Sequence, residues 1–211
     1  MKKSKWMKGV AVAAIAAMSV GMLAGCGNGN SQQEEKVYKV GIVQLMQHGA
    51  LDQANQGMID GLKAGGYEEG KNLEINQQNA QGDQSNLQSI AQQFLSDEVD
   101  MILSIATPST QVMAAATEDI PIVGTAITSF EQAGLVNSDE EPGTNVTGTH
   151  DMTPVAEQID LLLQVVPDAK TIGTIYTSSE KNSQIQVGIL KEVCAEKGCQ
   201  RYSAGCTELG G

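Results

Sequence analysis

Hydrophobic and polar positions follow two alternating periods through the first part of the chain. Short runs rich in apolar and β-branched residues predict strands at residues 38–44, 72–78, 99–105 and 120–125. Between these runs, apolar residues recur at spacings of three and four, which predicts amphipathic helices. The first helix carries Leu51, Ala54, Met58 and Leu62 on one face, and the second carries Leu87, Ile90, Ala91, Phe94 and Leu95. Strands that alternate with helices predict an α/β fold built on a parallel sheet with right-handed crossovers.

The alternation breaks after Gly134 and then resumes. Residues 137–143 are rich in Gly, Asp, Glu and Pro, and residues 145–149 form a short extended run. Beyond it, the pattern predicts helices on Val155, Ile159, Leu162, Leu163 and Val166 and on Ile185, Ile189 and Val193, a strand at 170–177, and a weak final segment from Gln200. We therefore expect a first α/β lobe at residues 37–149 and a hinge with an incomplete second α/β lobe at residues 150–211.

The first 25 residues have the pattern of a bacterial lipoprotein signal peptide. Four lysines precede an apolar run at residues 10–23, which is too short to cross a bilayer as a helix. Leu23-Ala24-Gly25-Cys26 matches a lipobox, so we expect cleavage before Cys26 and lipidation of its sulfur. The lipid would hold the protein extracytoplasmically on the bacterial membrane, with residues 26–36 as a flexible tether. The alternative is a secretory signal with an incidental cysteine.

Charge and cysteine content narrow the partners and the redox chemistry. The formal net charge is −12, and four of the lysines lie in the predicted signal peptide, so the acidic mature chain disfavours a nucleic-acid partner. Cys194, Cys199 and Cys206 lie near the C-terminus without a CxxC pair. We favour unpaired cysteines over a disulfide between two of them, which an extracytoplasmic location would allow.

The sequence offers little that catalysis or cofactor binding requires. The chain has two histidines, His48 and His150, and no G-x-S-x-G motif, so an activated nucleophile is not evident. No G-x-G-x-x-G or P-loop motif follows a predicted strand, and two distant histidines do not make a metal site. We predict a protein that is not an enzyme and that carries no cofactor or metal.

Polar residues after the predicted strands favour non-covalent binding of a small solute. Ligands of parallel sheets bind beyond the carboxyl ends of the strands. Thr107-Pro108 is expected to open a helix with Thr107 as its N-cap, and capping alone would explain that residue. Ser109 and Thr110 are not needed for capping, so this helix start could hold a carboxylate, with Thr125 as a further hydroxyl. The polar loop 176–183 is either a second binding segment or an N-capping loop.

Short segments in order along the chain carry a resemblance to a known family. They are residues 41–44 with 48–52, 57–62, 78–83, 105–109, 119–123, 145–149 with 151–152, and 176–180. Together these segments resemble the substrate-binding lipoproteins of ABC transporters assigned to tryptophan, tyrosine and related solutes. The resemblance implies a type I periplasmic-binding-protein fold, in which two lobes close on a solute and the closed form docks on a membrane permease.

The resemblance also implies a set of site residues. In similar amino-acid binders a helix start in the first lobe holds the ligand carboxylate, and this maps onto Thr107, Ser109 and Thr125, whereas Tyr176 and Ser178 lie where the second lobe would contact the ammonium end. The full set of expected ligand-binding residues is Gln44, His48, Asn79, Thr107, Ser109, Thr110, Thr125, Asp151, Tyr176 and Ser178. An aromatic ligand would find two aromatic side chains at expected cleft positions, Phe130 and Tyr176. The alternative is a sensory or structural lipoprotein of the same fold.

The chain departs from the family pattern at three places. His48-Gly49 stands where the family commonly has His-Pro, and Ser129-Phe130 stands where Asp-Pro is usual. From about Gln200 onward we expect the resemblance to stop and most of the second lobe to be absent. Such a lobe would expose apolar faces, and we expect weak or undetectable solute binding for residues 1–211 alone.

Overall fold

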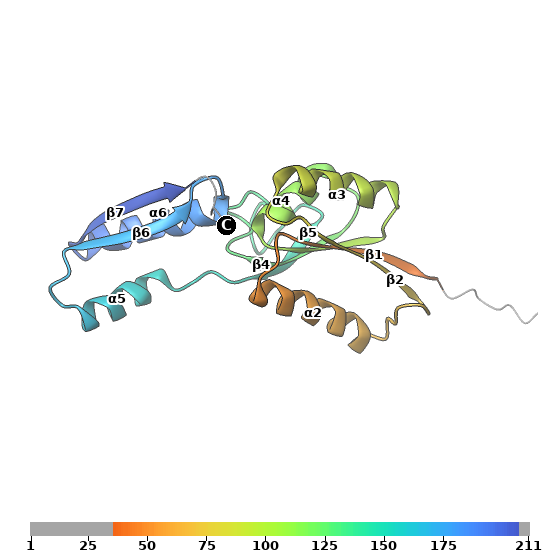
Figure 1. Ribbon diagram of the computed structural model, residues 1–211, viewed down its shortest axis with the longest axis horizontal. Coiled ribbons are helices and arrows are strands. Elements are labelled where there is room, and N and C mark those ends of the chain that lie inside the picture. The colour runs from red at the N-terminus through yellow and green to blue at the C-terminus, as the bar shows by residue number, and fades with distance from the viewer. Residues whose placement is uncertain (1–35, 207–211) are drawn as a thin grey trace, which may run out of the picture. The chain divides into compact units, whose positions relative to one another are not determined.

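The computed structural model describes residues 36–206, so Cys26, the predicted signal peptide and most of the predicted tether lie outside the described residues. The strands are β1 (Tyr38–Gln44), β2 (Leu73–Asn79), β3 (Met101–Ile105), β4 (Ile122–Ile127), β5 (Val146–His150), β6 (Thr171–Thr177) and β7 (Gln200–Cys206). The helices are α2 (Gly49–Ala64), α3 (Gln84–Ser96), α4 (Thr107–Ala116), α5 (Val155–Val165) and α6 (Lys181–Glu196) (Figure 1). The predicted succession of strands and helices is confirmed throughout.

Strands β1 to β5 form one parallel sheet in the order β2-β1-β3-β4-β5. We call residues 38–150, with their helices α2, α3 and α4, the five-stranded lobe. Helix α2 covers one face of the sheet, and α3 and α4 cover the other (Figure 1). The central strand β3 is therefore buried on both faces, as the continuous apolar run at residues 99–105 predicts.

Two apolar clusters fill the five-stranded lobe, one on each face of its sheet. On the α2 face, Val40 and Ile42 of β1 pack with Leu103 of β3 and with the apolar stripe of the helix. On the opposite face, Val43 packs with Phe94 of α3, and both side chains are fully buried. Alternate residues of β1 thus point to opposite faces and are covered on both, which is the arrangement that a period of two permits.

Strands β6 and β7 form a separate parallel sheet, in register from Thr171–Gln200 to Thr177–Cys206. We call residues 155–206, with α5 and α6, the two-stranded lobe. Its core joins α5, one face of β6 and α6 through Val155, Ile159, Ile172, Leu190, Val193, Cys194 and Cys199. Apolar surface is exposed here, as expected: Leu161, Val165, Val166 and Ile175 are 50–75% exposed.

Two features of the described residues bear on the sequence predictions. Cys199 is a free thiol, as predicted, and its Sγ donates a hydrogen bond to the carbonyl of Cys194 at 3.5 Å. Both cysteines are buried in the core of the two-stranded lobe. Within residues 36–206, the structure contains no helix long and apolar enough to cross a membrane.

Candidate functional site

The five-stranded parallel sheet brings several of the predicted polar residues together at the carboxyl ends of its strands. Gln44 ends β1 and lies opposite Asn79, the last residue of β2. On its other side Gln44 lies opposite Ile105 of β3, and Ile105 in turn lies opposite Thr125 of β4. Strand order reverses between β1 and β3, which is the switch point where open parallel sheets bind ligands.

The turn from β3 into α4 has an unusual backbone. Ala106 adopts φ +83° and ψ 151°, a left-handed conformation that costs a non-glycine residue about 1–3 kcal/mol. Its N–H donates to the carbonyl of Thr125 at 3.0 Å, and its carbonyl accepts from the N–H of Thr110 at 3.1 Å. Such strain is often retained where it serves binding or catalysis.

Ala106, and not Thr107, is the N-cap of α4, so the predicted cap is wrong. The helix begins one residue earlier than predicted, because the positive φ of Ala106 completes the turn out of β3. No side chain caps the helix, and Pro108 lies in the first turn as expected. Thr107 is therefore the first helical residue, and its hydroxyl is not consumed by capping.

Two hydroxyl groups at this helix start are buried without a partner. Thr107 is 1% exposed and Ser109 is 0% exposed, and neither Oγ atom has a hydrogen-bond partner within the described part of the chain. Leaving a buried hydroxyl unsatisfied costs about 1–3 kcal/mol. The first N–H groups of a helix also lack intrahelical acceptors and carry a partial positive charge. The start of α4 thus presents unused donors.

Thr110 differs from these two residues. Its Oγ1 lies 2.7 Å from the Oγ of Ser104 and donates to the carbonyl of Ala106 at 3.1 Å. The hydroxyl of Thr110 is thus occupied inside the core and holds the first turn of α4 to β3.

The end of β4 next to this turn is also irregular. Ala126 has φ +56°, and the pairing with β5 shifts between Gly124 and Ile127. At Gly148 of β5, with φ +153°, a Cβ atom would lie 1.9 Å from the carbonyl oxygen of Gly124, so only glycine fits. Next to this register shift, the Oγ1 atoms of Thr125 and Thr149 lie 3.0 Å apart and form a hydrogen bond.

At the end of β1, Gln44 is buried and fully hydrogen-bonded. Its Nε2 donates to the carbonyl of Met46 at 2.8 Å and to Oδ1 of Asp52 at 2.6 Å. Its Oε1 accepts from Nδ2 of Asn55 at 3.0 Å, and Oδ1 of Asn55 accepts from Nε2 of Gln77 at 2.9 Å. Gln44 therefore fixes the loop between β1 and α2.

Sequence reasoning missed the part that α2 has in this network. Asn55 is buried on the otherwise apolar face of α2, beside Ala54 and Met58. The position of this one amide on an apolar helix face could have indicated the network, because a buried amide needs hydrogen-bond partners.

His48 and Asn79 hold local backbone turns in this structure. His48 is the N-cap of α2, and its Nδ1 accepts from the N–H of Ala50 at 3.3 Å. Asn79 accepts from the N–H of Gln81 through Oδ1 at 2.8 Å, which forms an Asx turn after β2. Both side chains are exposed at the carboxyl edge of the sheet.

Asp83 closes the same loop by capping α3. Its Oδ1 accepts from the N–H groups of Ser85 at 2.6 Å and Asn86 at 3.1 Å. A side-chain hydrogen bond from Ser85, followed by these two backbone bonds, holds the pKa of Asp83 below its usual value.

The remaining expected residues lie on several elements. Asp151 is exposed just after β5 and donates its N–H to the carbonyl of Ile127 at 2.8 Å. Tyr176 on β6 and Ser178 after it are half-buried. Phe130, which is expected near the solute, is buried against Gly124, because the segment after β4 folds back onto the sheet.

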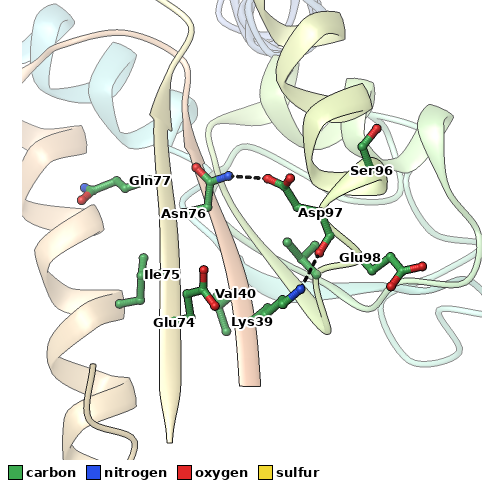
Figure 2. A pocket seen from close by; sticks show the side chains of 10 residues that line it. Lys39, Val40, Glu74, Ile75, Asn76, Gln77, Ser96, Asp97 and Glu98 are labelled. Carbon is green, nitrogen blue, oxygen red and sulfur yellow. Dashed lines mark hydrogen bonds between the residues drawn. The ribbon is translucent and has the colours of Figure 1, made fainter. Parts of the chain in front are cut away.

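A hollow of about 540 Å³ lies at the opposite half of the sheet from this edge (Figure 2). Residues from the early parts of β1 and β2 and from the end of α3 line it. Asp97 accepts hydrogen bonds from Nδ2 of Asn76 at 2.9 Å and, through its carbonyl, from Nζ of Lys39 at 3.1 Å. None of the predicted ligand-binding residues lines this hollow. Within residues 36–206, no group of three or more His, Cys, Asp or Glu side chains could hold a metal ion.

The sequence profile of the family described as "ABC transporter substrate binding protein" matches residues 39–208. The chain belongs to this family. The match includes all of β7, so the expectation that the resemblance stops near Gln200 is wrong. The registered pairing of β7 with β6 agrees with the longer match.

Several relatives of this substrate-binding protein are known. A tyrosine-binding protein from Clostridioides difficile is 43% identical in an alignment of 201 positions that covers 91% of this chain and 58% of the relative. A crystal structure of a conserved domain protein from Vibrio cholerae is 42% identical with a TM-score of 0.79. The structure of an ABC domain from Streptococcus pneumoniae in complex with L-Trp is 35% identical with a TM-score of 0.78. Each structural match covers 82% of this chain and 58% of the other.

These relatives confirm the predicted fold class, a parallel-sheet periplasmic-binding-protein lobe. One of these relatives is a tyrosine-binding protein and another was solved with L-Trp, which fits a non-enzymatic, solute-binding role. ABC substrate-binding proteins act outside the cytoplasm. The chain spans 58% of the length of the relatives that it matches.

Proposed function

We propose that this protein binds an aromatic amino acid and delivers it to the permease of an ABC importer. Two of its relatives support the ligand class, since one is a tyrosine-binding protein and another was solved with L-Trp. The observation that carries the proposal is the pair of buried, unpartnered hydroxyls of Thr107 and Ser109 at the start of α4.

A carboxylate satisfies these groups better than a neutral ligand does. It accepts several hydrogen bonds at once, and a bond from a neutral donor to a charged acceptor contributes about 1.5–3 kcal/mol. The partial positive charge at a helix N-terminus adds to this preference. In this proposal the ligand carboxylate lies at the first turn of α4 and accepts hydrogen bonds from the two buried hydroxyls.

The other predicted residues take more peripheral roles. Thr125, with its hydroxyl bonded to Thr149, forms the neighbouring rim on β4. Tyr176, Ser178 and Asp151 contact the ammonium end or the side chain of the solute. Gln44, His48 and Asn79 position the loops after β1 and β2 and act on affinity through those loops.

The anchor is the second part of the proposal. Lipidation of Cys26 holds the protein at the membrane surface, where the permease is, and so raises the local concentration of loaded binder. Mass spectrometry of the protein expressed in a bacterial host tests this step: the mass of a lipidated, processed N-terminus supports it, and an unmodified Cys26 at the membrane contradicts it.

A titration of the full chain with matched ligands tests the carboxylate site. L-tryptophan and tryptamine differ by one carboxylate, so L-tryptophan should bind more tightly by an order of magnitude or more, as one charge-assisted hydrogen bond implies. Thr107→Val and Ser109→Ala should each weaken L-tryptophan by about 10-fold or more and leave tryptamine unchanged. Ser89→Ala, on the exposed face of α3, is the control. Equal affinity for the two ligands would refute the site.

A further inference from the structure

The turn that ends α6 brings two buried cysteines together. After the last helical residue, Glu196, the chain leaves the helix at Gly198, whose φ of +70° is the left-handed conformation that glycine adopts readily. The N–H of Cys199 donates to the carbonyl of Cys194 at 3.0 Å, and the N–H of Gly198 donates to the carbonyl of Ala195 at 3.4 Å. These two bonds define a Schellman turn, in which the first and last side chains often contact each other.

The backbone bond limits the separation of the two cysteines. With an N···O distance of 3.0 Å and standard backbone bond lengths, the Cα atoms of Cys194 and Cys199 lie within about 7 Å of each other. They lie closer than this limit, because the bonds between them are not collinear. Disulfides join Cα atoms that are about 4.4–6.8 Å apart. The Sγ of Cys199 also lies 3.5 Å from the carbonyl oxygen of Cys194, so this thiol is directed back toward Cys194.

The two thiols differ in their access to solvent. Cys194 is 1% exposed, and Cys199 is 8% exposed. Both belong to the core of the two-stranded lobe, where Leu190 and Val193 pack with them. Cys199 lies beyond the end of α6, and helix ends open more readily than helix interiors. An oxidant in solvent therefore reaches Cys199 before it reaches Cys194.

The surroundings of this protein favour oxidation of such a pair. ABC substrate-binding proteins act outside the cytoplasm, where disulfides form and persist. The turn also leads directly into β7, because the N–H of Gln200 donates to the carbonyl of Lys170 at 2.7 Å, next to the start of β6. A covalent bond across the turn would hold the start of β7 against the end of α6.

We propose that Cys194 and Cys199 form a redox-active pair that closes a disulfide across the C-terminal turn of α6. The thiols seen in the structure are the reduced state of this pair. Neither the proposed solute nor a lipid on Cys26 takes part in its oxidation.

The oxidant is an external disulfide, R–S–S–R. The thiolate of Cys199 attacks one of its sulfurs, which breaks the S–S bond, releases R–S⁻ and leaves a mixed disulfide on Cys199. The thiolate of Cys194 then attacks the sulfur of Cys199 and releases the second R–S⁻. The pair loses two electrons, the external disulfide is reduced to two thiols, and the two cysteine protons pass through solvent to the released thiolates.

Peptide mapping after oxidation tests the proposal. Trypsin cleavage after Lys191, Lys197 and Arg201 places Cys194, Cys199 and Cys206 on three different peptides, residues 192–197, 198–201 and 202–211. The folded full chain is incubated with oxidised glutathione as R–S–S–R, its remaining thiols are blocked with N-ethylmaleimide, and the digest is analysed by mass spectrometry. We expect peptides 192–197 and 198–201 to be joined, with loss of their blocked forms, and peptide 202–211 to be joined to neither.

Single variants test the order of attack. Cys194→Ala should leave glutathione on Cys199, because the mixed disulfide is no longer resolved. Cys199→Ala should leave Cys194 as a thiol, because its side chain is 1% exposed. Cys206→Ala is the matched control and should keep the joined pair.

The map of the unsubstituted chain decides the proposal even where a variant fails to fold. The proposal is wrong if oxidised glutathione leaves both cysteines as thiols or stops at a mixed disulfide on Cys199. It is also wrong if either cysteine is joined to Cys26 or Cys206 instead.

Discussion

β1 and β6 have similar sequences and similar local partners, yet their surroundings differ. Each strand pairs in parallel with the next strand along the chain and packs one face on the intervening helix. When Val40-Gly41 of β1 is aligned with Ile172-Gly173 of β6, Val43 corresponds to Ile175. Val43 is fully buried, whereas Ile175 is 75% exposed. The difference arises from β3 and α3, which lie later in the sequence and cover β1. A local pattern can thus form a strand without determining how deeply the strand is buried.

Substitution by lysine at the two corresponding positions should have the largest effect. Val43→Lys places a charge between β1 and α3, and it should cost about 4 kcal/mol or more and unfold the five-stranded lobe. Ile175→Lys lies at the surface and should change the free energy of unfolding by about 0.5 kcal/mol or less. Urea denaturation followed by circular dichroism measures both. Similar losses for the two variants would mean that Ile175 is covered in the folded protein as Val43 is.

Gly41 of β1 and Gly173 of β6 also correspond in this alignment and give a second pair of matched positions. Gly41→Val would force its side chain into Phe94 and should destabilise the protein by about 1–3 kcal/mol. Gly173→Val meets no described atom and should be neutral or stabilise slightly, because valine favours strands and restricts the unfolded chain. Thermal melting is a sufficient measurement. A destabilised Gly173→Val variant would mean that this face of β6 is covered.

Neighbouring hydroxyls on α4 should separate stability from binding. Thr110→Val removes the hydrogen bonds to Ser104 and to the carbonyl of Ala106, so it should cost about 1 kcal/mol. Ser109→Ala removes a hydroxyl that has no hydrogen-bond partner among residues 36–206, so it should be neutral or stabilising although it lowers the affinity for the ligand. Melting temperatures in the absence of ligand test this prediction, and a fall for Ser109→Ala would indicate a structural role.

The smallest effects concern pH and again differ between the lobes. The pKa of Asp83 is lowered by its bonds to Ser85 and Asn86, so its contribution to stability is complete above the ordinary value of 3.8 and is lost as pH falls through the lower folded pKa. The pKa of Lys197 is raised above 10.5, mainly by its hydrogen bond with Asp160, so that contribution is complete below 10.5 and is lost as pH rises through the folded pKa.

Hydrogen exchange across the pH range, with Asp83→Asn and Lys197→Gln as controls, tests both signs. Each variant should reduce the pH dependence of hydrogen-exchange protection in its own lobe and leave that of the other lobe unchanged. If the two-stranded lobe lost protection as pH falls, and Lys197→Gln removed that loss, the sign given for Lys197 would be wrong.

The succession of elements could be predicted because periodicity and turn residues are local. The cap of α4 was misassigned because threonine favours capping, whereas the fold holds Ala106 at a positive φ through its bond to Thr125. The burial of Phe130 could not be predicted, because its sequence position after β4 does not reveal that the loop folds back. The network of Gln44 and Asn55 joins residues on different elements, and such pairing depends on tertiary contacts that a pattern does not contain.

The most direct test of the proposed site is a two-dimensional nuclear magnetic resonance titration of the full chain with L-tyrosine and, in parallel, tyramine. This measurement detects weak binding and reports where the ligand lies. We predict that L-tyrosine shifts the amide signals of residues 106–110 and those around Thr125, and that tyramine leaves residues 106–110 unchanged. Equal shifts with the two ligands, or L-tyrosine shifts that spare the start of α4, would contradict the account.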